Sequence, residues 1–301
     1  MKSVSFGQRP PVSGMPANRD SETLLLDTYL RQLRLPTFAR QHARYAEDAA
    51  KSNLGYERYL LLLAEQEVAQ RECNQQAARI KAARLPVMKE LAEFDFSALP
   101  KLPKIQVLEL LRGEYIPTAE PVILVGNPGL GKTHIATSLA LAACRQGRKV
   151  RFYNVAALVN ELLQAQERNQ VARFITTALS QHLIVLDELG FIPFSASGAQ
   201  LLFQFCSALY ERVALIITTN LRFADWPQVF QDERLTAALL DRLTHRAHIL
   251  EFVGESYRFR QRMSRQTQLA KGRQVDGEPE SELEHQIQLQ STEKEVLESK
   301  S

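Results

Sequence analysis

A glycine-rich segment between an apolar run and a helix-like run carries the clearest chemistry of the 301-residue sequence. It reads GNPGLGKT and has the spacing G-x-x-x-x-G-K-T. Glycines allow backbone N–H groups to turn toward phosphate oxygens, and the following helix presents its positive end to the same oxygens. Lys132 is predicted to contact the outer phosphates of a nucleotide, and Thr133 to hold Mg²⁺ through its hydroxyl. The predicted nucleotide-binding residues are Gly126, Asn127, Pro128, Gly129, Leu130, Gly131, Lys132, Thr133 and His134.

Two carboxylates follow another apolar run. In LIVLDE, residues 183–188, four apolar residues precede Asp187 and Glu188. A buried strand of a parallel sheet delivers the residues at its carboxyl end to the ligand crevice. Asp187 is therefore predicted to join Thr133 in holding Mg²⁺, and Glu188 to orient and deprotonate a water that attacks the terminal phosphate. This pair favours hydrolysis over simple binding, although a strand followed by a solvated acidic turn has the same sequence pattern.

A third apolar run, ALIITTN, ends in the polar residues Thr218, Thr219 and Asn220. At the same crevice the Asn220 amide could hydrogen-bond the attacking water or the terminal phosphate. Capping of the next loop by Asn220 is the alternative.

An arginine near the end of a helical run is a candidate for a role in a neighbouring subunit. Arg242 lies in LTAALLDRLT, from which its guanidinium could stabilise charge on the partner's nucleotide. Arg234 and Arg246 compete for this role. A surface salt bridge of Arg242 with Asp241 or Asp232 is the alternative.

The elements that must position these residues alternate along the chain. Apolar runs typical of strands occupy residues 121–126, 149–155, 182–188, 213–220 and 247–253, and helical segments separate them. This alternation predicts an α/β fold with a parallel sheet flanked by helices. Upstream, Leu26, Tyr29, Leu30 and Leu33 form an amphipathic stripe that Pro36 interrupts, and residues 56–84 form a long helical stretch. They indicate a small all-helical domain.

The composition divides the chain into five segments. Residues 1–20 are predicted to be a disordered lead-in, 21–95 a helical domain for DNA binding and assembly, 96–120 a connector, 121–262 the nucleotide-binding domain and 263–301 a disordered acidic tail. The formal charge is only +3, from 37 basic and 34 acidic residues, so net charge alone does not indicate a nucleic-acid partner. Three widely spaced cysteines, with neither a signal peptide nor a membrane span in the sequence, lead us to expect a cytoplasmic protein.

Five phrases in order resemble the IstB-like ATP-binding proteins, helpers of insertion-sequence transposition related to the DnaC-type helicase loaders. They are GNPGLGKTHIA, LIVLDELGFIPF, LIITTN, DWPQVFQDERLTAALLDRLTHRAHIL and GESYR. The resemblance implies an AAA+ P-loop ATPase with a five-stranded sheet, in which Asp187 and Glu188 are the Walker B pair, Asn220 is sensor 1 and Arg242 is the arginine finger. It also implies ATP-dependent homo-oligomers on double-stranded target DNA that recruit and stimulate a transposase. Little sequence follows the last strand before the polar tail, so we expect the helical lid to be absent, and the role of Arg258 as sensor 2 stays open.

Basic side chains are the candidates for contact with DNA. Rows of them on successive helical turns would neutralise phosphates and give salt-dependent binding with weak sequence preference. Interleaved glutamates make a solvated helix face an equal alternative for each residue of the helical domain. The resemblance adds two arginines in the helical excursion after KVRFYN, where related initiator-type ATPases contact nucleic acid. The predicted DNA-binding residues are Arg31, Arg34, Arg79, Lys81, Arg84, Arg168 and Arg173.

Two other functions share the same residues. A helicase loader keeps the ATPase but acts on single-stranded DNA and a replicative helicase. A nucleotide-gated scaffold uses ATP to hold an oligomer together with little catalysis. Binding to duplex against single-stranded DNA separates the first alternative, and a comparison of Lys132→Ala with Glu188→Gln separates the second.

Overall fold

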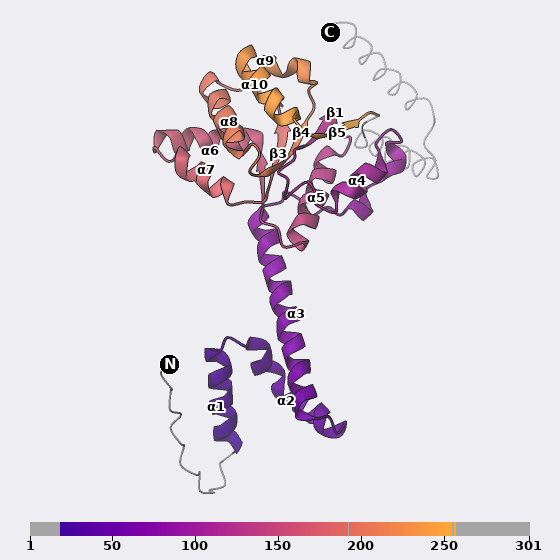
Figure 1. The fold of residues 1–301 in the computed structure, drawn as a ribbon, viewed down its shortest axis with the longest axis vertical. Coiled ribbons are helices and arrows are strands. Elements are labelled where there is room, and N and C mark those ends of the chain that lie inside the picture. Colours follow the sequence, from indigo (N-terminus) through magenta and orange to yellow (C-terminus); the bar gives the residue numbers. More distant parts are fainter. Residues whose placement is uncertain (1–18, 192, 255, 257–301) are drawn as a thin grey trace, which may run out of the picture. The chain divides into compact units, whose positions relative to one another are not determined.

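The structure, a computed structural model, describes residues 19–191, 193–254 and 256 (Figure 1). The predicted acidic tail, the first eighteen residues of the predicted lead-in and Arg258 lie outside this part. Contacts divide the chain into two compact units, Met1–Ala78 and Arg79–Ser301. The division falls inside a helix, whereas the sequence pattern placed the end of the helical domain at residue 95. Among the described helices, none is long and apolar enough to cross a membrane.

The first unit is built from three helices. They are α1 (Arg19–Gln32), α2 (Pro36–Lys51) and α3 (Tyr56–Ala83), of which α3 continues into the second unit. Helix α2 starts with Pro36, a favourable first position because the missing N–H has no intrahelical acceptor there. Among the described residues of this unit, the buried apolar side chains are few: Leu30, Ala49 and Leu63.

A buried glutamate joins α3 to the start of α2. The backbone N–H of Thr37 donates to Glu67 Oε2 at 2.8 Å, and Arg71 Nε donates to Glu67 Oε1 at 2.7 Å. Arg71 also donates to the carbonyl of Arg34 in the turn between α1 and α2. Burial by itself raises the pKa of Glu67, but the hydrogen bonds from Arg71 and Thr37 outweigh it and leave this pKa below its usual value. The carboxylate therefore holds the helix N-terminus, the turn and α3 together.

The predicted apolar stripe of α1 is only partly buried. Leu30 is covered, whereas Leu26, Tyr29 and Leu33 are exposed, the last by 67%. Amphipathic spacing shows which face could be buried, but burial needs a second element on that face. α1 packs on α2, and Leu30 is the buried residue of the predicted stripe.

The second unit contains a five-stranded parallel sheet in the order β2-β3-β4-β1-β5. All five predicted strands are present and the predicted fold class is confirmed. The strands are β1 (Val122–Gly126), β2 (Val150–Asn154), β3 (Leu183–Leu189), β4 (Ala214–Thr219) and β5 (His248–Phe252). The helical elements are η1 (Leu91–Glu93), η2 (Phe96–Ala98), α4 (Lys104–Leu110), α5 (Lys132–Arg145), α6 (Val155–Glu167), α7 (Val171–Leu179), α8 (Ala196–Leu209), η3 (Phe223–Asp225), α9 (Trp226–Phe230) and α10 (Glu233–Thr244).

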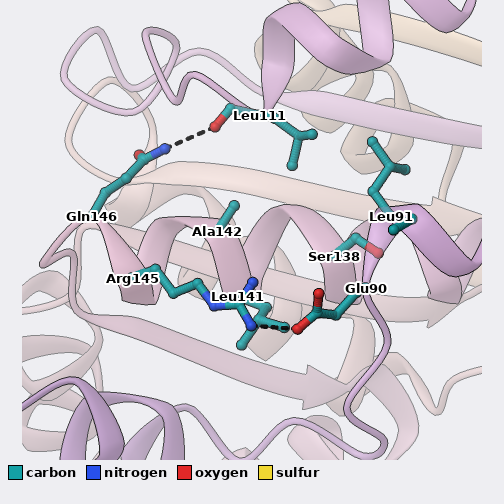
Figure 2. Close-up of a pocket in the computed structure, with 9 residues that line it drawn as sticks. Glu90, Leu91, Leu111, Ser138, Leu141, Ala142, Arg145 and Gln146 are labelled. Carbon is teal, nitrogen blue, oxygen red and sulfur yellow. Dashed lines mark hydrogen bonds and ion pairs between the residues drawn. The ribbon is translucent and has the colours of Figure 1, made fainter. Parts of the chain in front are cut away.

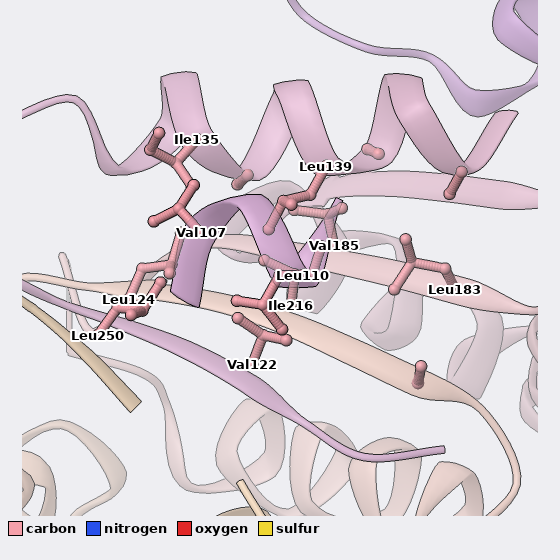
Figure 3. Close-up of a cluster of buried hydrophobic side chains, with 14 of the residues drawn as sticks. Val107, Leu110, Val122, Leu124, Ile135, Leu139, Leu183, Val185, Ile216 and Leu250 are labelled. Atoms are coloured by element: carbon pink, nitrogen blue, oxygen red, sulfur yellow. The ribbon is translucent and has the colours of Figure 1, made fainter. Parts of the chain in front are cut away.

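Alternate residues of the three central strands, β3, β4 and β1, enter two separate apolar layers. Leu183 and Val185 of β3 belong to the layer with α4 and α5, whereas Ile184 and Leu186 belong to the layer with α6, α8, α9 and α10. Figure 3 shows the first layer, where Leu139 of α5 lies over the sheet. Because both faces of these central strands are covered, they read as nearly continuous apolar runs in the sequence.

The carboxyl ends of three neighbouring strands meet at one edge of the sheet. β1 lies beside β4, and β4 beside β3, all in parallel. The glycine-rich loop leaves β1 at this edge, Asp187 and Glu188 lie near the end of β3, and β4 ends in Thr219. The fold thus brings together residues from three distant parts of the sequence.

Candidate active site

The loop between β1 and α5 has a backbone that needs glycine. Gly126, Gly129 and Gly131 have φ values of 149°, 82° and 88°, and Gly131 is the N-cap of α5. A Cβ on Gly126 would lie 2.3 Å from the carbonyl oxygen of Phe252. With no side chains in the way, the loop and the first turn of α5 form a cradle suited to phosphate.

Lys132 folds back across this loop. Its Nζ donates to the carbonyl oxygens of Gly126 at 2.5 Å and Asn127 at 2.8 Å. The ammonium group is therefore held beside the cradle, where it can contact the outer phosphates of a nucleotide, as the sequence predicts.

Two hydroxyl groups converge on one carboxylate oxygen of Asp187. Thr133 Oγ1 donates to Oδ1 at 2.8 Å, and Thr218 Oγ1 donates to the same atom at 2.6 Å. Burial raises the pKa of Asp187 above its usual value, and the two hydrogen bonds oppose this shift. Hydroxyl and carboxylate oxygens are the ligands that Mg²⁺ prefers, so Thr133 and Asp187 fit such an ion.

Glu188 is aimed by its backbone and by a neighbouring strand. Its φ of 61° lies in the left-handed region, and its Oε2 accepts a hydrogen bond of 2.8 Å from Asn154 Nδ2. Asn154 ends β2 and also caps α6, because its Oδ1 accepts from the backbone N–H of Ala156 at 3.1 Å. Asn154 is not among the site residues predicted from the sequence, although it ends an apolar strand as a polar residue, the same signal that indicated Asn220.

Asn220 directly follows β4 at the same edge and is half-buried. In the part of the chain described, its side chain shares no hydrogen bond with Asp187 or Glu188. Its role as sensor 1 therefore remains a prediction.

The linker before the sheet flanks the glycine-rich loop. His134 Nε2 lies 2.9 Å from the carbonyl oxygen of Glu90, and the Phe94 ring meets the His134 ring edge-on at 5.3 Å. A Cβ on Gly131 would lie 2.7 Å from Phe94 Cε2. Phe94 thus restricts the loop from the side of the linker, a contact that no spacing in the sequence indicated.

A separate pocket of about 380 Å³ lies farther along α5. Figure 2 shows Glu90 paired with Arg145 on one side and Gln146 bonded to Leu111 on the other. None of the residues that line it belongs to the glycine-rich loop, so it is distinct from the phosphate cradle.

Arg242 lies far from the nucleotide cradle of its own chain. It occupies the last turn of α10, shortly before β5 begins at His248, which pairs with Val122 at the amino end of β1. Its Nη1 donates to Ser207 Oγ, and its guanidinium lies 5.3 Å from the centre of the Phe203 ring, both on α8. The competing arginines, Arg234 and Arg246, are exposed.

The predicted DNA-binding residues do not share one environment. Arg79 Nε donates to the carbonyl of Cys144 at the end of α5, so its guanidinium already has an intramolecular partner. Arg168 is the C-cap residue that follows α6, and Arg173 lies on α7; both are exposed. The other four are also exposed: Arg31, Arg34, Lys81 and Arg84.

Comparison with known proteins places this site in a family. The family model of the IstB-like ATP binding proteins matches residues 28–265. The chain is 35% identical over 237 residues to a protein named as ATP-binding in insertion sequence IS21 of Pseudomonas aeruginosa, covering 79% of this chain and 89% of the relative. It is 32% identical over 234 residues to the corresponding protein of IS5376 from Geobacillus stearothermophilus, covering 78% and 93%.

Among solved structures, AMPPCP-bound DnaA from Aquifex aeolicus aligns with a TM-score of 0.48 and 18% identity, covering 66% of this chain and 59% of DnaA. The family model and the two relatives span most of this chain and nearly the whole of each relative. The chain belongs to the IstB-like ATP-binding protein family and is an ATPase, with its P-loop in the second unit.

Proposed function

We propose that this protein is a cytoplasmic ATPase that assembles on double-stranded target DNA and regulates or stimulates the transposase of its insertion sequence. The family supports the coupling of ATP to transposition, because the relatives are named for insertion sequences. The observation that carries the assembly is the position of Arg242, at the opposite edge of the sheet from the cradle. The arginine that completes the site of one protomer therefore comes from a neighbouring protomer.

The residues at the carboxyl edge divide the work of hydrolysis. The glycine-rich loop and Lys132 hold the phosphates, and Thr133 with Asp187 would hold Mg²⁺, which when bound supplies positive charge to the phosphate oxygens. Glu188 orients the attacking water and accepts its proton. Asn154 restrains the Glu188 carboxylate, which would otherwise rotate freely at this exposed position.

The DNA contact is proposed to run through exposed basic side chains. Arg168 and Arg173 support it, because both are exposed and neither belongs to an ion pair among the described residues. Such contacts neutralise phosphates, so binding should weaken steeply with salt and depend little on sequence. Arg79 contributes less, since its guanidinium is used within the chain.

The test is ATP hydrolysis by the full chain with and without duplex DNA, in the natural protein and in Glu188→Gln. We expect turnover that responds to DNA and is lost in the variant. Turnover that is absent in every condition, or that survives the substitution, contradicts the proposal. Imaging of the particle formed with ATP and long duplex DNA tests assembly directly, and a chain that stays monomeric there contradicts it.

Single-stranded DNA is the discriminating competitor. A transposition regulator should retain duplex DNA in its presence, whereas a helicase loader should exchange it for the single strand. If Lys132→Ala abolishes assembly while Glu188→Gln leaves target selection intact, the protein is a nucleotide-gated scaffold instead.

A further inference from the structure

The ladder between β3 and β4 is interrupted at the catalytic carboxylates. Leu186 pairs with Ile217, but the next pair is Leu189 with Thr219, so two residues of β3 face one residue of β4. Those two residues are Asp187 and Glu188. Such a bulge, rare between parallel strands, bends the strand and re-aims the side chain at the extra residue.

The residue opposite the bulge is Thr218, and its hydroxyl replaces the missing ladder contact. The backbone N–H of Glu188 donates to Thr218 Oγ1 at 2.9 Å, and Thr218 Oγ1 donates to Asp187 Oδ1 at 2.6 Å. Thr218 is 1% exposed, so water is not available to take over either bond. One hydroxyl thus serves as acceptor for one residue of the pair and as donor to the other.

We propose that Thr218 is a positioning residue for ATP hydrolysis, whose hydroxyl fixes Asp187 and Glu188 relative to each other across the bulge. The inference rests on the proposed role of Glu188 as the base. Glu188 has a left-handed backbone, which a bulge tolerates only when surrounding contacts hold it. Thr218 supplies the contact to its backbone, and Asn154 the contact to its side chain. A base held at both points stays aimed at the terminal phosphate.

The neighbouring Thr219 provides a matched control. It lies on the same strand, is likewise 1% exposed and has the same side chain. Its hydroxyl accepts from the backbone N–H of Leu221 at 3.1 Å and does not bond Asp187 or Glu188. Replacement of either threonine by valine keeps the branched shape and removes one buried hydroxyl, so the two variants differ in which groups lose a partner.

The experiment compares Thr218→Val, Thr218→Ser and Thr219→Val in the full chain with ATP, Mg²⁺ and duplex DNA. Single-turnover hydrolysis at saturating ATP and the affinity for ADP are measured for each. We expect Thr218→Val to slow hydrolysis by about 10- to 100-fold, the usual effect of losing a residue that orients an active-site carboxylate. Thr218→Ser should restore most of the rate, Thr219→Val should stay near the natural rate, and ADP affinity should be unchanged throughout.

Three results overturn the inference. They are a Thr218→Val rate equal to that of Thr219→Val, a Thr218→Ser rate as low as that of Thr218→Val, and a rate loss matched by loss of ADP binding, which would mark a purely structural hydroxyl. Should Thr218→Val fail to fold, Thr218→Ala removes the same hydroxyl with less bulk and is judged in the same way. Glu188→Gln, measured in parallel, separates the two proposals: if it hydrolyses ATP normally, the role of Glu188 fails, whereas if it alone is inactive, only the role of Thr218 fails.

Discussion

A catalytic site completed by a neighbour can be restored by mixing two inactive variants. Glu188→Gln keeps the arginine but lacks the base, and Arg242→Ala keeps the base but lacks the arginine. Loss of an arginine finger lowers hydrolysis by about 10³-fold or more, so each variant alone should be nearly inactive. In a mixed oligomer, a site on an Arg242→Ala protomer can receive the guanidinium of a Glu188→Gln neighbour.

The position of Arg242 explains why one chain does not complete its own site. β5 pairs residue by residue with β1 from His248 to Phe252, so roughly 13 Å separate the two edges of the sheet at about 3.3 Å per residue. Arg242 is near the amino edge and turned toward Ser207, so it does not reach its own cradle. With equal amounts and random exchange, about one quarter of the sites combine an intact base with an intact finger, since each comes from one half of the subunits.

The assay is steady-state ATP hydrolysis of the 1:1 mixture with duplex DNA, after exchange of subunits. We expect about one quarter of the natural rate. A mixture of Lys132→Ala with Glu188→Gln is the control, because both residues act in the site of their own chain and mixing cannot combine an intact Lys132 with an intact Glu188 in one site. If the first mixture shows only the mean of its two parents, Arg242 does not act between subunits and the assembly argument fails.

Three further predictions concern the stability of the two units. Because the folded-state pKa of Glu67 is lowered, its contribution to the free energy of unfolding should be complete above about pH 4.3 and lost as the pH falls through the lower folded-state pKa. Thermal unfolding of the full chain at several pH values should show this dependence, and it should be weaker in Glu67→Gln. An unchanged pH profile in the variant would contradict the prediction. Gly147 has a left-handed backbone and open space around it, so Gly147→Ala should lower the free energy of unfolding by about 1–2 kcal/mol. Gly126→Ala should lower it more, because the new Cβ would clash with the Phe252 carbonyl oxygen. Equal losses in denaturant titrations would refute this clash. Asn154→Ala removes the N-cap of α6 and should lower the free energy of unfolding by about 1 kcal/mol, whereas Asn154→Ser keeps a capping oxygen and should lower it much less. Denaturant titration measures this difference. Equal losses in the two variants would mean that the cap contributes nothing.

The sheet and the phosphate cradle were predictable because their signals are local. Each strand is a short apolar run between helical segments, and G-x-x-x-x-G-K-T contains the turn, the cation and the hydroxyl within eight residues. The exposed stripe of α1 shows the limit of such patterns. Leu30 and Leu33 have the same apolar character and a spacing that predicts one helix face, yet Leu30 is buried, whereas Leu33 lies just past the end of α1 and is 67% exposed.

The remaining parts of the site depend on strand order, which residue spacing does not contain. Asn154 reaches Glu188 only because β2 lies beside β3. Thr218 reaches the Asp187 carboxylate and the Glu188 backbone N–H only because β4 lies on the other side. The bulge adds a second non-local condition, since it is defined by a difference of one residue between two strands. If β3 and β4 paired without it, Glu188 would take an ordinary extended backbone and its N–H would enter the ladder. The Thr218 hydroxyl would then accept no hydrogen bond from Glu188. The catalytic geometry therefore depends on how β3 pairs with β4 as much as on the two carboxylates.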